Sequence, residues 1–147
     1  MSFQGYSAVT VPSSETKTFV AACAQIHVES GDVSANLNRA TAAVRSAADQ
    51  GAELIVLPEM WTTSFVVEPS QSLAQAALEA EEAMTSLSGE LGVMVIGGGL
   101  EHEDGQYFNR CSLADRGKVL STYRKIHLFS PNAEHQQTTP GSAAAIV

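Results

Sequence analysis

The sequence predicts an α/β fold built around a parallel sheet. Two apolar, strand-like segments, residues 19–28 and 54–57, flank a stretch with helical periodicity, which is the pattern of a β-α-β unit. The second segment has four consecutive large aliphatic residues, which suit a strand covered on both faces, as in parallel sheets. We therefore expect an α/β domain whose β-α-β crossover is right-handed.

The composition is that of a folded, acidic domain. The 147 residues fit one domain, and 44% hydrophobic residues suffice for a core. A net charge of −8 argues against nucleic acid or membrane as a partner, because both require a basic patch. Since the sequence shows neither a membrane span nor a signal peptide, we expect a cytoplasmic protein. Cys23 and Cys111 are interpreted as buried thiols, not as a disulfide or zinc site.

The N-terminal part of the chain divides into an arm and the first helix. Residues 1–17 are rich in Ser, Thr, Gly and Pro without periodicity, so we expect a flexible arm followed by a domain over residues 18–147. After the 19–28 strand, apolar residues at helical spacing from position 33 to 47 predict a helix. Asp32 or Ser34 can cap its start, and Gly51 stands just past its end.

A second helix is predicted over residues 70–91, where apolar residues alternate steps of four and three. This stripe is interpreted as packing on the sheet; a groove for a partner is the less favoured alternative. Its acidic residues are expected on the solvated side of the helix, and they are Glu79, Glu81 and Glu82.

Residues 93–124 read as three successive strands. The first, residues 93–102, contains Gly97–Gly99, but a dinucleotide-binding fingerprint would need a further glycine and a following helix, which this segment lacks. Glycines within a strand instead indicate a bulge or a close approach of another segment. A turn at 103–105 leads into a hairpin strand over 106–113, and a turn at 115–118 leads into a strand over 119–124.

The C-terminal part of the sequence is a long polar loop followed by an apolar run. Residues 126–141 contain two prolines and exceed the usual length of a connector, so they are a candidate binding segment. Residues 143–147 then begin another apolar run. Because a domain seldom ends partway into a buried strand, we expect the sequence to be a truncated domain.

Two charged residues directly follow predicted strands. Pro58 stops strand pairing, so Glu59 should emerge at the carboxyl end of its strand, where open α/β sheets place their ligand crevices. Lys125 follows the strand that ends at Arg124. We expect Glu59 and Lys125 to form an ion pair at the carboxyl ends of neighbouring strands. A solvated charge in a turn is the alternative for each.

These positions lie in motifs that occur in a fixed order. The two longest are Leu57-Pro58-Glu59-Met60-Trp61-Thr62-Thr63-Ser64-Phe65 and Tyr123-Arg124-Lys125-Ile126-His127-Leu128-Phe129. Residues 20–25, 107–110 and 134–141 contribute three shorter ones. With these motifs the sequence resembles, over residues 19–147, the carbon-nitrogen hydrolases of the nitrilase superfamily.

The resemblance implies a fold and a chemistry. The fold is an α-β-β-α sandwich, truncated here, and complete members commonly form homo-oligomers through their helix layers. The reaction converts a small-molecule amide to a carboxylic acid and ammonia through Glu, Lys and Cys, without a cofactor or metal. Glu59 matches the general base, Lys125 the stabiliser of the oxyanion, and Glu134 a second glutamate near the lysine. Residues 60–65 suggest ω-amidase-like substrates.

One part of the family pattern is missing. The nucleophilic Cys of the family follows the next strand after the lysine, beyond Val147, whereas Cys23 and Cys111 stand within earlier strands. Without a thiolate the covalent route is closed, so we expect this chain alone to be inactive. The alternative is a non-catalytic α/β module that binds or associates. A metal site is disfavoured because the four histidines are scattered without ligand spacing.

Overall fold

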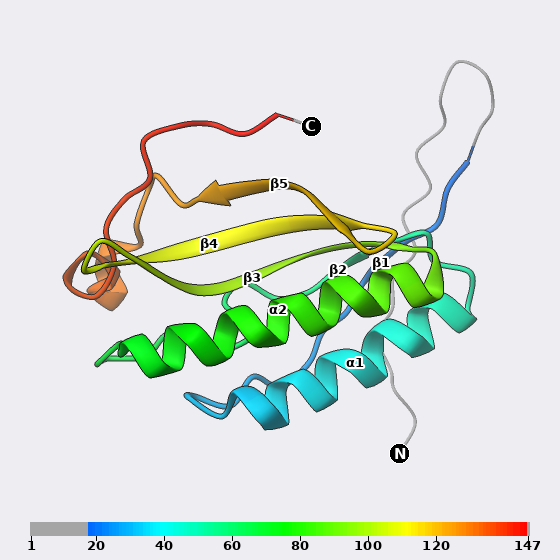
Figure 1. The fold of residues 1–147 in the computed structure, drawn as a ribbon, viewed down its shortest axis with the longest axis horizontal. Helices are drawn as coiled ribbons and strands as arrows, with labels where there is room; N and C mark the ends of the chain where they lie inside the picture. Colours follow the sequence, from blue (N-terminus) through cyan, green and yellow to red (C-terminus); the bar gives the residue numbers. More distant parts are fainter. Residues whose placement is uncertain (1–17, 147) are drawn as a thin grey trace.

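The computed structural model describes residues 18–146, which form one five-stranded sheet with two helices on one face (Figure 1). The arm predicted for residues 1–17 lies outside the described residues. The strands follow each other across the sheet in chain order: β1 Ala21–Cys23, β2 Leu54–Val56, β3 Met94–Glu103, β4 Gln106–Asp115 and β5 Lys118–Arg124. The pairs β1–β2 and β2–β3 are parallel, and β3–β4 and β4–β5 are antiparallel. The sheet is therefore mixed, with its β-α-β part at one edge.

Helix α1, Val33–Asp49, begins and ends where its sequence signals stand. The Oδ1 of Asp32 accepts a hydrogen bond from the Ala35 N–H at 3.0 Å, so Asp32 and not Ser34 is the cap. Gly51, just past the C-terminus, has a φ of 87°, which favours glycine. The helix packs Ala40 and Val44 into the core beneath β1 and β2. The predicted β-α-β unit is thus confirmed.

Helix α2, Gln71–Leu91, lies beside α1 on the same face of the sheet (Figure 1). Ser70 caps it by accepting from the Leu73 N–H at 3.2 Å, and Gly92 ends it with a φ of 68°. Its apolar stripe, including Ala77 and Met84, is buried as predicted. Within the described residues, no helix combines the length and the apolar character that crossing a membrane requires.

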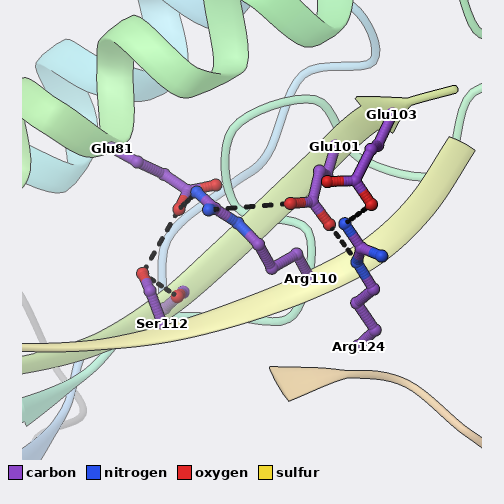
Figure 2. A network of polar contacts seen from close by, with 7 residues as sticks. Glu81, Glu101, Glu103, Arg110, Ser112 and Arg124 are labelled. Atoms are coloured by element: carbon purple, nitrogen blue, oxygen red, sulfur yellow. Dashed lines mark hydrogen bonds and ion pairs between the residues drawn. The ribbon is translucent and has the colours of Figure 1, made fainter. Parts of the chain in front are cut away.

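The prediction that Glu81 lies on the solvated side of α2 is wrong. Its carboxylate is buried against the sheet, where Oε2 accepts from Arg110 Nη2 at 2.6 Å and from Ser112 Oγ at 3.2 Å (Figure 2). Burial raises the pKa of Glu81, and the charge and hydrogen bond of Arg110 offset only part of that rise. A buried carboxylate is tolerated here because β4 supplies the opposite charge.

Arg124 and Arg110 extend the contacts of Glu81 across the neighbouring strands. Arg124 of β5 donates from Nε to Glu101 Oε2 at 2.6 Å and from Nη2 to Glu103 Oε2 at 2.8 Å (Figure 2). Arg110 Nη1 lies 3.9 Å from Glu101 Oε1. The three carboxylates and two guanidinium groups therefore join α2, β3, β4 and β5 into one polar network.

Strand β1 is shorter than the predicted strand over residues 19–28. The neighbouring strand β2 ends at Val56 and the chain then turns at Pro58, so residues 25–28 have no strand to pair with. The prediction of two buried thiols also fails. Cys23 is exposed, because β1 is an edge strand and the side chain of Cys23 lies on the opposite face of the sheet from that of Ala22, which packs in the core with the helices. Cys111 is half-buried.

The face of the sheet opposite the helices is apolar. Val56, Ile96 and Leu113 are paired across it and are only partly buried. Helices α1 and α2 both lie on the other face of the sheet (Figure 1). Residues 143–146, predicted to begin a strand, form none and are exposed. The described residues thus provide one helix layer and one sheet layer of the sandwich that the resemblance implies.

Candidate functional site

Glu59 lies in a loop, residues 57–65, that is fixed in place on both sides of it. Before Glu59, the Leu57 N–H donates to the Ile96 carbonyl at 2.8 Å. After it, Met60 adopts a φ of 51° and its carbonyl accepts from the Ser64 N–H at 2.8 Å. Trp61 in this turn is only 1% exposed. The loop is therefore an anchored segment that leaves Glu59 at the surface.

Two glycines of β3 allow this loop to pack closely against the strand. A Cβ at Gly97 would lie 2.8 Å from Trp61 Nε1, and a Cβ at Gly99 would overlap Thr62 Oγ1. The predicted close approach at the glycine run is thus confirmed.

Lys125 joins two carboxylates. Its Nζ lies 2.9 Å from Glu59 Oε1 and 2.8 Å from Glu134 Oε2, which confirms the predicted ion pair of Glu59 and Lys125. The prediction that they follow neighbouring strands is wrong, because β3 and β4 stand between β2 and β5. Glu59 nevertheless reaches both strands, because its Oε1 contacts Asn109 of β4 and Lys125 just after β5. Glu59, Lys125, Glu134 and Asn109, described below, are called the Lys125 cluster.

Glu134 is a fully bonded anion. It lies in the second of two short 3₁₀ helices, Ser130–Asn132 and Glu134–Gln136, of the polar loop, and it is 3% exposed. Its Oε2 accepts from Lys125 Nζ and from the Phe129 N–H, and its Oε1 accepts from Asn109 Nδ2 at 2.9 Å. Burial alone would raise the pKa of Glu134, but the hydrogen bonds from Asn109, Lys125 and Phe129 lower it below its usual value.

Glu59 has a different environment. Its side chain is 52% exposed, and its Oε1 accepts from both Asn109 Nδ2 at 2.7 Å and Lys125 Nζ at 2.9 Å. Its Oε2 has no hydrogen-bond partner among residues 18–146. One oxygen of Glu59 is therefore held in place while the other is free to accept a proton.

Lys125 is positioned as a cation with a donor to spare. An ammonium group has three N–H donors, and the described contacts use two of them. Partial burial lowers the pKa of Lys125, but the hydrogen bonds to Glu134 and Glu59 outweigh it and the net pKa is raised. Lys125 therefore stays charged at neutral pH.

Asn109 is the member of the cluster to which the sequence reasoning gave no role. It lies in β4 and is 5% exposed. Its side-chain Nδ2 contacts both carboxylates, and its backbone carbonyl accepts a hydrogen bond from the backbone N–H of Lys125 at 2.9 Å. Its position in the middle of a strand, beside the apolar Phe108, was the available signal, because polar side chains buried in strands need partners.

Neither cysteine belongs to the cluster. No hydrogen bond links Cys23 or Cys111 to it in the part of the chain that the structure describes. Burial raises the pKa of Cys111, and the charges of Glu81 and Glu59 raise it further, so this thiol resists deprotonation. Within the same residues, no group of three or more His, Cys, Asp or Glu side chains is placed to hold a metal ion.

Comparison with known proteins identifies the family. Residues 20–143 match the sequence profile described as carbon-nitrogen hydrolase. The chain belongs to the carbon-nitrogen hydrolase family. The match includes the motifs around Glu59 and Lys125, together with Glu134, so the whole Lys125 cluster lies inside the family domain.

Curated relatives of this carbon-nitrogen hydrolase chain include omega-amidases. The omega-amidase of Danio rerio is 36% identical over 117 residues, which are 76% of this chain and 41% of that protein. The chloroplastic omega-amidase of Arabidopsis thaliana is 32% identical over 131 residues, 84% of this chain and 35% of that protein. The chain thus spans less than half the length of these relatives.

Solved structures of amidases share the fold. An amidase from Nesterenkonia sp. superposes with a TM-score of 0.73 at 24% identity, covering 84% of this chain and 48% of that one. A mutant of the Nesterenkonia sp. AN1 amidase, with the acetamide moiety of fluoroacetamide added covalently at the active site cysteine, gives a TM-score of 0.71 at 26% identity, with the same coverage of both chains. The mixed α/β fold therefore matches nitrilase-superfamily amidases over about half their length.

Proposed function

We propose that this carbon-nitrogen hydrolase chain carries the general base and the oxyanion stabiliser of an amidase, which converts a small amide to a carboxylic acid and ammonia. The observation that carries the proposal is the asymmetry of the Lys125 cluster. Among residues 18–146, Glu59 Oε2 and one N–H of Lys125 have no hydrogen-bond partner, whereas both carboxylate oxygens of Glu134 are bonded. A base and a cationic donor are thus adjacent and oriented, as acyl transfer requires.

In the proposed reaction, Glu59 Oε2 takes the proton of a cysteine thiol. The sulfur then attacks the amide carbon, and the free N–H of Lys125 donates to the oxyanion that forms. When the C–N bond breaks, Glu59 returns its proton to the leaving nitrogen, which departs as ammonia. Water then attacks the thioester carbon, again with Glu59 as base, and the carboxylic acid leaves with the thiol restored.

Glu134 has a supporting role in this proposal. Because its lowered pKa and three hydrogen bonds keep it a fixed anion, it holds the ammonium of Lys125 without competing with Glu59 for the proton of the thiol. Glu59 accepts a hydrogen bond from the same ammonium through Oε1, and its Oε2 does not contact this group. The two carboxylates that the resemblance pairs with the lysine are therefore chemically distinct.

The nucleophile is the missing element of the proposed site. The resemblance places it beyond Val147, and the covalent adduct at the active site cysteine of the Nesterenkonia sp. AN1 amidase mutant supports that type of route. Unassisted attack of water on an amide is very slow, so we expect the 147-residue chain alone to be inactive. The names of the curated relatives support ω-amides as substrates.

The test is the release of ammonia from a panel of small ω-amides. The 147-residue chain is compared with a longer form that contains the sequence encoded downstream of Val147. We expect activity only in the longer form, and a loss on the order of 10³ to 10⁶ in kcat on Glu59→Gln or Lys125→Ala.

A Cys111→Ala variant of both forms is the control. Activity of the 147-residue chain that disappears with Cys111→Ala would show that the nucleophile lies in β4, contrary to the proposal. Absence of activity in the longer form would favour the non-catalytic binding module instead.

A further inference from the structure

We infer that Asn109 is a positioning residue of the Lys125 cluster, which determines which oxygen of Glu59 remains free. The effect of Asn109 on catalysis rests on the proposed function, whereas its effect on the geometry of the cluster does not. Asn109 is the one side chain of the cluster that carries no charge. It nevertheless contacts both carboxylates, through Nδ2 at 2.7 Å from Glu59 Oε1 and 2.9 Å from Glu134 Oε1.

The orientation of the Asn109 amide follows from its surroundings. An amide group has two N–H donors on one atom, so it can donate to two acceptors that lie close together. The opposite orientation would place the amide oxygen against two carboxylates and remove both of these hydrogen bonds. The contacts with Glu59 and Glu134 therefore fix Nδ2 between them.

The backbone at Asn109 is rigid because β4 is paired on both sides. Asn109 is opposite Leu100 of β3, and the next residue, Arg110, is paired with Arg124 of β5. The backbone carbonyl of Asn109 also accepts a hydrogen bond from the backbone N–H of Lys125 at 2.9 Å. One residue thus contacts Lys125 through its backbone and both glutamates through its side chain.

The charges of the cluster explain why a neutral donor is needed. Two carboxylates share one ammonium, so the cluster has an excess of one negative charge, and the carboxylates repel each other. Glu59 is half exposed and would be free to turn if Lys125 alone held it. With two donors on Oε1, its carboxylate has a single orientation, in which Oε2 faces away from Asn109 and Lys125.

The first test uses Asn109→Asp, which keeps the shape of the side chain and replaces the donor by a third carboxylate. The chain has three lysines, Lys17, Lys118 and Lys125, so the Lys125 signal can be assigned and titrated by NMR with carbon-13-labelled lysine. We expect the pKa of Lys125 to rise further, because another negative charge stabilises the ammonium. General loosening of the site would instead return this pKa toward its ordinary value.

Thr122→Asp is the matched control, since it adds the same charge on β5 at an exposed position three residues before Lys125. We expect it to change the Lys125 pKa less than Asn109→Asp does. Equal shifts in the two variants, or a lower Lys125 pKa in Asn109→Asp, would overturn the inference.

A second variant, Asn109→Ala, removes the donor without adding charge, and it decides the question if Asn109→Asp does not fold. Glu134 then loses the largest of the hydrogen-bond effects that lower its pKa. We therefore expect the carboxyl pKa of Glu134, followed by NMR with carbon-13-labelled glutamate, to rise. An unchanged Glu134 pKa in a folded Asn109→Ala protein would refute the positioning role.

The longer form adds a catalytic readout. Misplacing a catalytic group by about 1 Å costs about 10²-fold, so we expect Asn109→Ala to lower kcat by that factor with little change in KM. If the longer form is inactive, the proposed function fails, while the NMR titrations still decide whether Asn109 positions the cluster. A loss that appears only in KM would contradict the inference.

Discussion

Replacing Arg110 by Met should destabilise the fold by leaving Glu81 buried without its cation. Arg110 Nη2 donates to Glu81 Oε2 at 2.6 Å, and the two side chains are only 17% and 7% exposed. Met fills much of the volume of the arginine stem but has no charge and no donor. Ser112 would remain as the partner of Glu81, since it lies on the same strand and donates at 3.2 Å.

The expected loss is large because the remaining charge is desolvated. Removing one partner of a buried ion pair typically costs about 3–5 kcal/mol, a large part of the roughly 5–15 kcal/mol that a domain has in total. Replacing both partners by apolar residues is usually neutral or stabilising. We therefore expect the double variant Arg110→Met with Glu81→Leu to recover most of the loss.

The pH dependence of the loss identifies its cause. The pKa of Glu81 is already raised in the folded chain, mainly by burial, so its protonated form stabilises the fold at acid pH and this stabilisation is lost as pH rises through the raised pKa. Without Arg110 the pKa of Glu81 rises further. The difference in stability between the variant and the original chain should therefore be small at acid pH and grow toward neutral pH.

Urea unfolding followed by circular dichroism measures these differences in unfolding free energy. The exposed pair of Arg45 and Glu90 is the matched control, because it has similar distances of 2.8 and 2.9 Å but side chains that are 45% and 59% exposed. We expect Arg45→Met to change stability little. A double variant at Glu81 and Arg110 as unstable as Arg110→Met alone would refute the reasoning.

Two further predictions concern the loop and the thiols. Gly97→Ala should lower the unfolding free energy by about 1–3 kcal/mol, because the new methyl group would crowd Trp61. The fluorescence of this single tryptophan should also change. An unchanged spectrum and an unchanged stability would contradict the close approach. Cys23 should react with a thiol reagent at mildly alkaline pH about tenfold faster than Cys111, because Cys23 is exposed and the pKa of Cys111 is raised. The variants Cys23→Ser and Cys111→Ser assign the fast and slow phases of the reaction to their thiols. Equal reaction rates of the two thiols would contradict this prediction.

The sequence by itself determined most of the local structure. The bounds of α1 and α2 follow from residues at their ends, Asp32 and Ser70 as caps and Gly51 and Gly92 with positive φ, because these signals act over a single turn of chain. The ion pair of Glu59 and Lys125 was also predictable. Both residues follow strands that run in the same direction, so both emerge at the same end of the sheet.

Only the tertiary structure decided which side chains are covered. Alternation along a strand assigns residues to two faces, but it does not say which face packs against helices, so Cys23 was misplaced. Helical periodicity likewise assigned Glu81 to the solvated side of α2, because it does not indicate that Arg110, 29 positions further on, supplies an opposite charge. Burial of a charge depends on a partner that is distant in sequence.

The same limit applies to the site. The motifs indicated Glu59, Lys125 and Glu134, but the free oxygen of Glu59 and the bonded state of Glu134 depend on Asn109, which comes from a different strand. That contact forms only in the folded chain, where the loop of residues 57–65 packs against β3 at two glycines and Glu59 lies beside Asn109 of β4 and Lys125. Sequence determined which groups could act, and the packing of the loop against the sheet decided which atoms of those groups remain free, since hydrogen bonds between remote segments form only when the chain is folded.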